Sequence, residues 1–230
     1  MASNTRYTRV PSTTTDDHAS KTVRVAVMGS TRGTDLQAIF DAIGSGALTG
    51  IEIPIVLSNK EDAGILQRAR DNGYNGVFLD PKGLTRAAYD AQVSALFERE
   101  AIELVLLIGY MKLMSGGFVA RWRNRVMNIH PSLLPAFAGG MDLNVHEAVL
   151  ARGCRVSGAS LIFIDEGPDT GPIISQEVVP VAYSNGPGGD TPDTLKAKVQ
   201  AAEGRLLVQA LEWWRDGRIS VKGTTVMIDL

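Results

Sequence analysis

The chain has 230 residues, of which 44% are hydrophobic and 21% charged, and its formal net charge is −2 at pH 7. A chain of this length and composition can bury a full core unaided, and its slightly acidic balance argues against nucleic-acid binding through a broad basic face. The single cysteine, Cys154, rules out an internal disulfide framework and fits a reducing compartment, and we expect its role to be structural. No run approaches the ~18–20 apolar residues of a membrane span.

The first 22 residues differ in composition from the rest of the chain. They are rich in Ser and Thr and contain no apolar segment, so they do not resemble a secretory signal. Asp16 and Asp17 make an organelle address the weaker interpretation of this segment, because transit peptides are poor in acids. We therefore expect residues 1–22 to be a disordered tail and residues 23–230 to form one domain. A cytoplasmic location follows, with organelle targeting by the tail left open.

Short apolar runs alternate with helical patterns in the first half of the chain. Strands are predicted at residues 23–28, 51–57, 75–79 and 104–108, and helices at residues 35–43, 63–72 and 85–100. The run at 104–108 is apolar throughout, as expected of a strand covered on both faces. Strand alternating with helix predicts a parallel, doubly wound α/β sheet of the Rossmann-like kind.

The order of the elements changes after residue 128. A short helix is predicted at 145–151, and two consecutive strands at 157–164 and 172–181 predict an antiparallel C-terminal extension of the mostly parallel sheet. A loop rich in Gly, Pro and Asn, which we expect to be exposed, leads to a long helix ending near residue 216. Thr191 is its predicted N-cap and Pro192 its first residue. Residues 221–230 suggest a peripheral strand.

A turn that contains two glycines, Gly29-Ser-Thr-Arg-Gly33, joins the first predicted strand to the first helix. Glycine lets the backbone approach a ligand, and the N-terminus of the following helix offers N–H groups to an anion. The three-glycine spacing of a dinucleotide site is absent, and such turns need glycine for geometry alone, so phosphate binding and a plain turn both stay open. Asp35 would repel a phosphate unless its side chain caps the helix, and Arg32 can supply an offsetting charge.

The sequence Val-Met-Asn-Ile-His-Pro-Ser-Leu-Leu-Pro at residues 126–135 carries the main candidates for chemistry. In a strand, Asn128 and His130 point the same way, toward the carboxyl end of the sheet where ligands bind. A turn following the next strand, Asp165-Glu-Gly-Pro-Asp169, can bring a carboxylate to the same place, although acids also shape such turns through backbone bonds. A hydrogen-bond donor, an imidazole and a tuning carboxylate together suit attack on a carbonyl.

The other ionisable residues suggest no metal centre. One cysteine and one well-placed histidine supply too few ligands for zinc. We expect His146 on the surface of its helix, and a role in the site stays open. We also expect Asp169 to favour the charged imidazolium of His130 and to raise its pKa above the usual value of about 6.5.

These segments resemble the folate-dependent formyltransferases, and the resemblance runs from Val23 to about Arg218. The stretch from Asn128 to Pro135 and the stretch Asp169-Thr-Gly-Pro-Ile-Ile carry its most specific motifs, and Leu36-Gln-Ala-Ile resembles the branch that acts on glycinamide ribonucleotide (GAR). The resemblance implies that 10-formyltetrahydrofolate, as co-substrate, gives its formyl group directly to the amine of GAR. It implies two small-molecule partners and no metal, nucleic acid or membrane, in a monomer or homodimer.

The resemblance also implies roles for individual residues. The implied catalytic residues are Asn128, His130 and Asp169; those for the ribonucleotide are Gly33, Thr34, Asp35 and Glu203; those for folate are Arg86, Met111, Lys112, Leu113, Met114 and again Asn128.

Three departures from the family pattern concern the site. Asp35 stands where Asn is more usual, Ile162 stands where many relatives have His, and residues 138–143 differ from the better-known members. The first bears on the choice of acceptor and the others on the shape of the pocket.

Alternative functions share the catalytic motif. A methionyl-tRNA formyltransferase is expected to carry a further RNA-binding domain, and a formyltetrahydrofolate hydrolase a further regulatory domain. We expect neither in a chain with 22 residues before its domain and none after Leu230. A formyltransferase for another amine and a catalytically silent folate or nucleotide binder stay open, although a binder has no need of all three catalytic groups.

Overall fold

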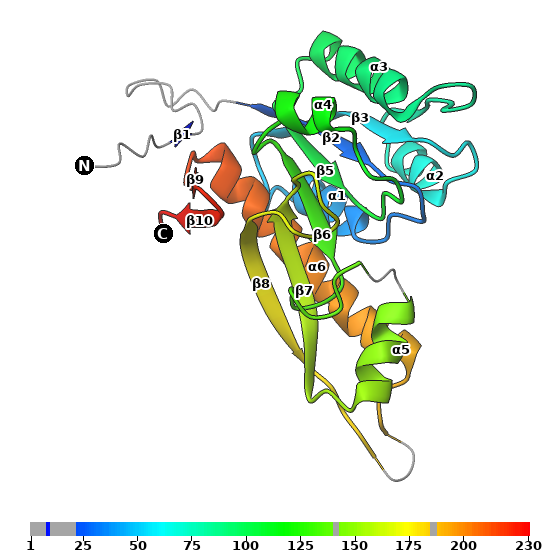
Figure 1. Ribbon diagram of the computed structural model, residues 1–230, viewed down its shortest axis with the longest axis vertical. Coiled ribbons are helices and arrows are strands. Elements are labelled where there is room, and N and C mark those ends of the chain that lie inside the picture. Colours follow the sequence, from blue (N-terminus) through cyan, green and yellow to red (C-terminus); the bar gives the residue numbers. More distant parts are fainter. Residues whose placement is uncertain (1–7, 10–21, 140–142, 185–187) are drawn as a thin grey trace.

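The computed structural model describes residues 8–9, 22–139, 143–184 and 188–230. Its main sheet contains β2 (Val23–Met28), β3 (Ile51–Ser58), β4 (Gly76–Phe78), β5 (Leu104–Leu107), β6 (Val126–His130), β7 (Val156–Phe163) and β8 (Ile173–Pro180). The strand order is β4-β3-β2-β5-β6-β7-β8. Figure 1 labels β3, β2, β5, β6, β7 and β8 of this sheet. Every pairing from β4 to β6 is parallel, whereas β6–β7 and β7–β8 are antiparallel. The predicted fold class is confirmed.

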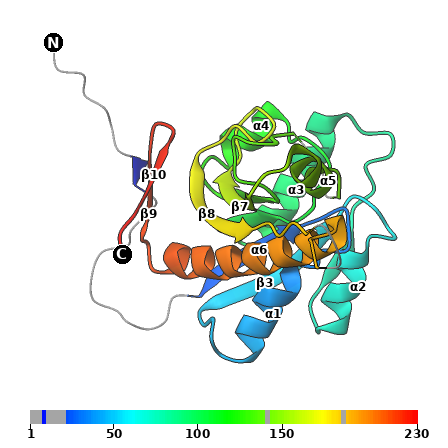
Figure 2. The same ribbon diagram turned by 90° about the horizontal axis from the view of Figure 1, so that it is seen from below.

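Helices cover both faces of this sheet. The described helices are α1 (Leu36–Gly44), α2 (Gly64–Asp71), α3 (Arg86–Arg99), α4 (Gly116–Arg121), α5 (Leu143–Arg152) and α6 (Pro192–Arg215). Buried side chains of α1, α2, α5 and α6 share one apolar cluster, and those of α3 and α4 share the other. Figure 2 shows α1 and α6 on one side of the sheet and α3 and α4 on the opposite side.

The central position of β5, with helices on both faces of the sheet, explains why its sequence is apolar throughout. Leu104 and Leu106 belong to the cluster on the α1 and α6 side, and Val105 and Leu107 belong to the cluster under α3 and α4. Successive strand residues point to opposite faces, so a sheet covered on both sides buries all four. Each such burial contributes roughly 1.5–3 kcal/mol from the hydrophobic effect.

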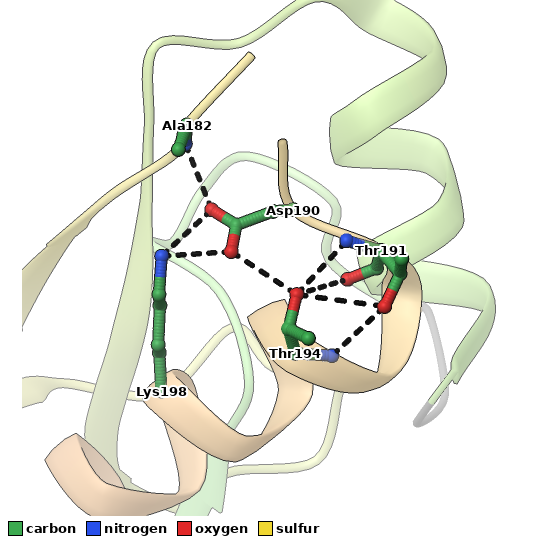
Figure 3. Close-up of polar contacts among 5 residues, drawn as sticks. All are labelled: Ala182, Asp190, Thr191, Thr194 and Lys198. Atoms are coloured by element: carbon green, nitrogen blue, oxygen red, sulfur yellow. Dashed lines mark hydrogen bonds and ion pairs between the residues drawn. The ribbon is translucent and has the colours of Figure 1, made fainter. Parts of the chain in front are cut away.

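The start of α6 is held by a polar network at the end of the loop that follows β8 (Figure 3). Thr191 and Thr194 form a reciprocal capping box, as Thr191 Oγ1 accepts from the Thr194 N–H and Thr194 Oγ1 accepts from the Thr191 N–H. The Asp190 carboxylate accepts from the Ala182 N–H at 2.8 Å and lies 2.7 Å from Lys198 Nζ. The predicted N-cap is confirmed, and these bonds fix the first turns of the helix.

The structure differs from the sequence prediction mainly at small elements. Helix α4 was not predicted, since it begins Gly116-Gly117 and glycine has low helix propensity. The C-terminal segment forms a hairpin of β9 (Ile219–Lys222) and β10 (Thr225–Ile228), where one strand was expected.

The predicted N-terminal tail lies largely outside the described residues. Within it, Thr8–Arg9 forms β1, which pairs antiparallel with β9 and completes a three-stranded sheet beside the C-terminal end of α6 (Figure 1). Across the described ranges, no helix is long and apolar enough to cross a bilayer.

Candidate active site

A cleft of about 610 Å³ opens at the carboxyl ends of β2, β5 and β6. Its walls come from the turns that follow these strands, from the acidic turn between β7 and β8, and from one face of α6. This is where ligands bind in open parallel sheets, at the point where successive crossovers diverge to opposite faces.

Strand β6 places both of its polar residues in the cleft. Asn128 pairs with Leu107 of β5 on one side and with Ile162 of β7 on the other. His130, two residues further on, pairs with Ser160 of β7, and only 4% of its surface is exposed. Asn128 and His130 therefore share a face of β6, as their spacing predicted.

The chain that leaves His130 is tied to the antiparallel strands. The Ser160 hydroxyl donates to the carbonyl of Ser132 at 2.7 Å and accepts from the Leu134 N–H at 2.9 Å. Gln176 Nε2 donates to the Leu134 carbonyl at 3.0 Å. These bonds hold the segment after His130 in one position, although the sequence did not single out Ser160 or Gln176.

Two aspartates in the acidic turn between β7 and β8 have different roles: Asp165 shapes the turn, and Asp169 faces the cleft. Asp165 Oδ1 accepts from the Gly167 N–H at 3.0 Å and from Thr170 Oγ1 at 2.6 Å, which is the turn-forming role. A Cβ on Gly171 would lie 1.8 Å from the Phe163 carbonyl oxygen, so the turn presses against the end of β7. Asp169 adopts a φ of +55° within this turn, which only a few residue types besides glycine tolerate.

Asp169 brings the predicted catalytic residues together. Its Oδ2 lies 3.3 Å from His130 Nδ1 and accepts from the Gly139 N–H at 2.9 Å. Its Oδ1 lies 3.4 Å from Asn128 Nδ2, at the long end for a hydrogen bond. One carboxylate thus orients the imidazole and the carboxamide.

The protonation of His130 differs from the prediction. Burial lowers the pKa of the His130 imidazole below its usual value, and it outweighs the Asp169 carboxylate and the Phe137 carbonyl, both of which raise that pKa. The expected increase was wrong because the sequence does not show how deeply the ring is buried. Its Nε2 lies 3.3 Å from the Phe137 carbonyl oxygen, so both ring nitrogens face acceptors and only the imidazolium can donate to both.

The turn after β2 forms the opposite part of the cleft. Gly33 has a φ of +58°, and a Cβ there would lie 2.4 Å from Ile65, so this position requires glycine. Asp35 stands at the N-cap position of α1, but its side chain makes no capping hydrogen bond. The interpretation in which Asp35 folds back to cap the helix is therefore wrong, and its carboxylate is a charge that lines the cleft.

The predicted folate residues are only partly brought together. Met111, Lys112, Leu113 and Met114 line the cleft after β5. Leu113 is 51% exposed there and offers an uncovered apolar surface in the same cleft as Asn128 and His130. Arg86, the first residue of α3, is exposed and is not one of the described residues that line the cleft.

Several cleft residues were missed by sequence reasoning. Ser30 donates to Asn59 Oδ1 at 2.6 Å and accepts from the Met111 N–H at 3.1 Å, which ties two walls of the cleft together. His146 is 1% exposed and lines the cleft, so its predicted surface position was wrong. Lys196 and Gln200 of α6 line it too. Their spacing from Glu203, seven and three residues, is the helical signal that could have found them.

The structure also bears on two of the departures from the family pattern and on the prediction of no metal site. Ile162 is buried and forms an apolar wall next to Asn128. Of the divergent segment at 138–143, residues 140–142 lie outside the described part of the chain. Among the described residues, no group of three or more His, Cys, Asp or Glu side chains could hold a metal ion.

This fold and site define a class of enzyme that acts on a carbonyl group, with a donor, an imidazole and a carboxylate at the carboxyl edge of a Rossmann-like sheet. The family described as Formyl transferase matches residues 23–211. The chain belongs to the formyl transferase family.

Named relatives and a solved structure agree with this assignment. The chain is 34% identical to a phosphoribosylglycinamide formyltransferase of Escherichia coli K12, over 90% of this chain and 94% of that protein. It is 38% identical to the trifunctional purine biosynthetic protein adenosine-3 of Gallus gallus, over 86% of this chain but only 19% of that protein. The chain thus spans about a fifth of the trifunctional relatives. Glycinamide ribonucleotide transformylase 1 from Symbiobacterium toebii superposes with a TM-score of 0.82 at 36% identity, covering 90% of this chain and 94% of that one.

Proposed function

We propose that the protein transfers the formyl group of 10-formyltetrahydrofolate to the amine of GAR, a step of purine biosynthesis. The observation that carries this proposal is the Asp169 carboxylate, which lies 3.3 Å from His130 Nδ1 and 3.4 Å from Asn128 Nδ2 in one wall of the cleft. The names of relatives that match nearly end to end support the substrates.

The first step forms a bond between the amine nitrogen of GAR and the formyl carbon. The electrons of the carbonyl double bond move to the formyl oxygen, and a tetrahedral intermediate results. Asn128 has two N–H donors, and we assign one of them to this oxyanion, because its bond to Asp169 occupies only the other. One such donor contributes roughly 10²–10³ in rate.

The second step moves a proton and breaks the bond to folate. The attacking nitrogen becomes positively charged and loses a proton to His130, which burial keeps neutral more readily than an exposed histidine. The electron pair on the oxyanion then re-forms the carbonyl double bond, the bond between the carbon and N10 of the folate breaks, and His130 gives the proton to N10. The products are formylated GAR and tetrahydrofolate, and a general acid/base of this kind contributes roughly 10²–10⁴.

The two substrates occupy different parts of the cleft in this proposal. The phosphate of GAR binds at Gly33, Thr34 and Asp35, where the N-terminus of α1 offers N–H groups to an anion. Glu203 of α6, only 5% exposed, accepts the ribose hydroxyls. The folate ring lies against residues 111–114, where Leu113 offers an exposed apolar surface. A direct role for Arg86, a cytoplasmic location and the oligomeric state remain predictions.

The test is a product analysis with purified protein. With 10-formyltetrahydrofolate and GAR, we expect tetrahydrofolate and formylated GAR in equal amounts. Formate released at the same rate without GAR would instead establish the hydrolase. Folate binding without any product would establish the silent binder, and transfer only to another amine would show a different acceptor.

A further inference from the structure

One face of α6 presents three polar side chains to the cleft. Lys196, Gln200 and Glu203 follow one another at intervals of four and three residues, which places them on the same side of a helix, and all three line the cleft. Lys196 is 9% exposed and Glu203 is 5% exposed. Lysine is almost never buried to this extent unless it is paired, so the charge of Lys196 is held in place within the cleft wall.

Two contacts fix this face relative to the turn after β2. At its N-terminus, α6 is held by the reciprocal capping box of Thr191 and Thr194 shown in Figure 3. Further along, α6 packs closely on α1, because a Cβ on Gly204 would lie 2.7 Å from the Cβ of Ala38. Ala38 is one helical turn from Asp35, so the end of the polar face at Glu203 lies next to the turn proposed to hold the phosphate, and Lys196, roughly two helical turns further along α6, lines the same cleft.

Asp35 creates an electrostatic problem at that turn. Its carboxylate lines the cleft and is not used to cap α1, so it opposes a phosphate dianion nearby. The cleft cations Arg32, Lys60 and Lys112 are exposed, and water and salt screen their charges. Lys196 is the buried cation among the described residues that line the cleft, so its charge is screened least.

We propose that Lys196 determines specificity for a phosphorylated acceptor, by offsetting the Asp35 carboxylate and binding the phosphate oxygens of the acceptor. The proposal rests on the proposed function for the identity of that acceptor. It assigns to α6 a cationic contact with the phosphate as well as the proposed contact of Glu203 with the ribose.

The test compares Lys196→Met with the matched control Lys198→Met. Lys198 lies on the same helix but is half exposed, and its ammonium pairs with Asp190 outside the cleft. In Lys196→Met, we expect the KM for GAR to rise about tenfold or more, as for loss of a charge-assisted bond. The kcat, the KM for the formyl-folate and the KM for the unphosphorylated glycinamide riboside should change less than about threefold. Lys198→Met should leave all four constants near wild type.

A binding measurement separates this proposal from the proposed function. Ribose 5-phosphate, titrated by calorimetry, should bind about tenfold or more weakly to Lys196→Met than to wild type, and Lys196→Arg should retain most of the affinity. Adding Asp35→Asn to Lys196→Met should restore part of the lost affinity for ribose 5-phosphate. These results would support the proposal even if the wild type did not formylate GAR.

Two outcomes would overturn the proposal. One is an equal rise in the KM for GAR and in the KM for the unphosphorylated riboside, or a rise in KM that accompanies a lower Tm of Lys196→Met. Either result would make Lys196 a structural residue. The other is unchanged affinity for ribose 5-phosphate in a folded Lys196→Met.

Discussion

Asp169 Oδ2 lies 3.3 Å from His130 Nδ1, and the carboxylate and the burial of the imidazole act on its pKa in opposite directions. Burial is the larger influence and lowers the pKa of His130, while Asp169 raises it. The imidazole is therefore neutral more readily than an exposed one. The nearby Asp169 carboxylate still allows it to accept a proton during the reaction, because the carboxylate stabilises the imidazolium.

Neutralising Asp169 should move the pH–rate profile. In Asp169→Asn the influence that raises the pKa of His130 is lost, so that pKa falls further and the acid limb of kcat/KM shifts to lower pH. The measurement is kcat/KM for GAR from pH 5 to 9. Glu166→Gln, which removes a carboxylate from the same turn, is the control and should keep the wild-type limb. An unmoved limb and near-normal activity in Asp169→Asn would reduce Asp169 to a turn former.

The pKa of His130 also predicts how stability depends on pH. Since the folded-state pKa lies below the unfolded value of about 6.5, the unfolded chain binds more protons between these two values. Stability should fall as the pH is lowered from about 6.5 to the folded-state pKa of His130. Urea unfolding at several pH values should show this loss in wild type and its absence in His130→Gln. The same slope in both proteins would contradict the lowered pKa.

The close contact of α1 with α6 predicts an effect of a single methyl group. Gly204→Ala would place its Cβ 2.7 Å from the Cβ of Ala38, so the helices must separate. We expect a loss of roughly 1–3 kcal/mol in unfolding free energy, with a higher KM for GAR. Gly44→Ala, at the other end of α1, is the control, because a Cβ there meets nothing within 4 Å. It should be neutral or slightly stabilising. Equal effects of the two substitutions would refute the close packing.

Removing residues 1–21 should leave the activity intact. Within this segment, the described pairing is that of Thr8 and Arg9 with Val221 and Ser220 of β9, outside the cleft. We expect the kinetic constants of the truncated protein to stay within twofold of the full chain. A large fall in kcat/KM would show that the N-terminal segment contributes to the site.

The fold followed from the sequence because its signals are local. The apolar run of β5 and the Thr191-Pro192 start of α6 each depend on a few neighbouring residues. Helix α4 was missed because its Gly116-Gly117 start is stabilised by tertiary packing of Phe118 and Val119, not by propensity.

The site was predictable only where a motif marked it. Asn128, His130 and Asp169 do meet, as their spacing and the following turn suggested. The burial of His146 and the lowered pKa of His130 depend on which elements cover them, and no local pattern of the sequence shows that.

The most direct test of the account is a single-turnover measurement on Asn128→Ala with formyl-folate and GAR. Because Asn128 is assigned to the oxyanion, the rate of formyl transfer should fall roughly 10²–10³-fold, at least ~2.7 kcal/mol in the barrier. The Kd for formyl-folate, obtained from the same titration, should stay within a few-fold of wild type. A near-normal transfer rate with a much weaker Kd would contradict the account and make Asn128 a folate contact alone.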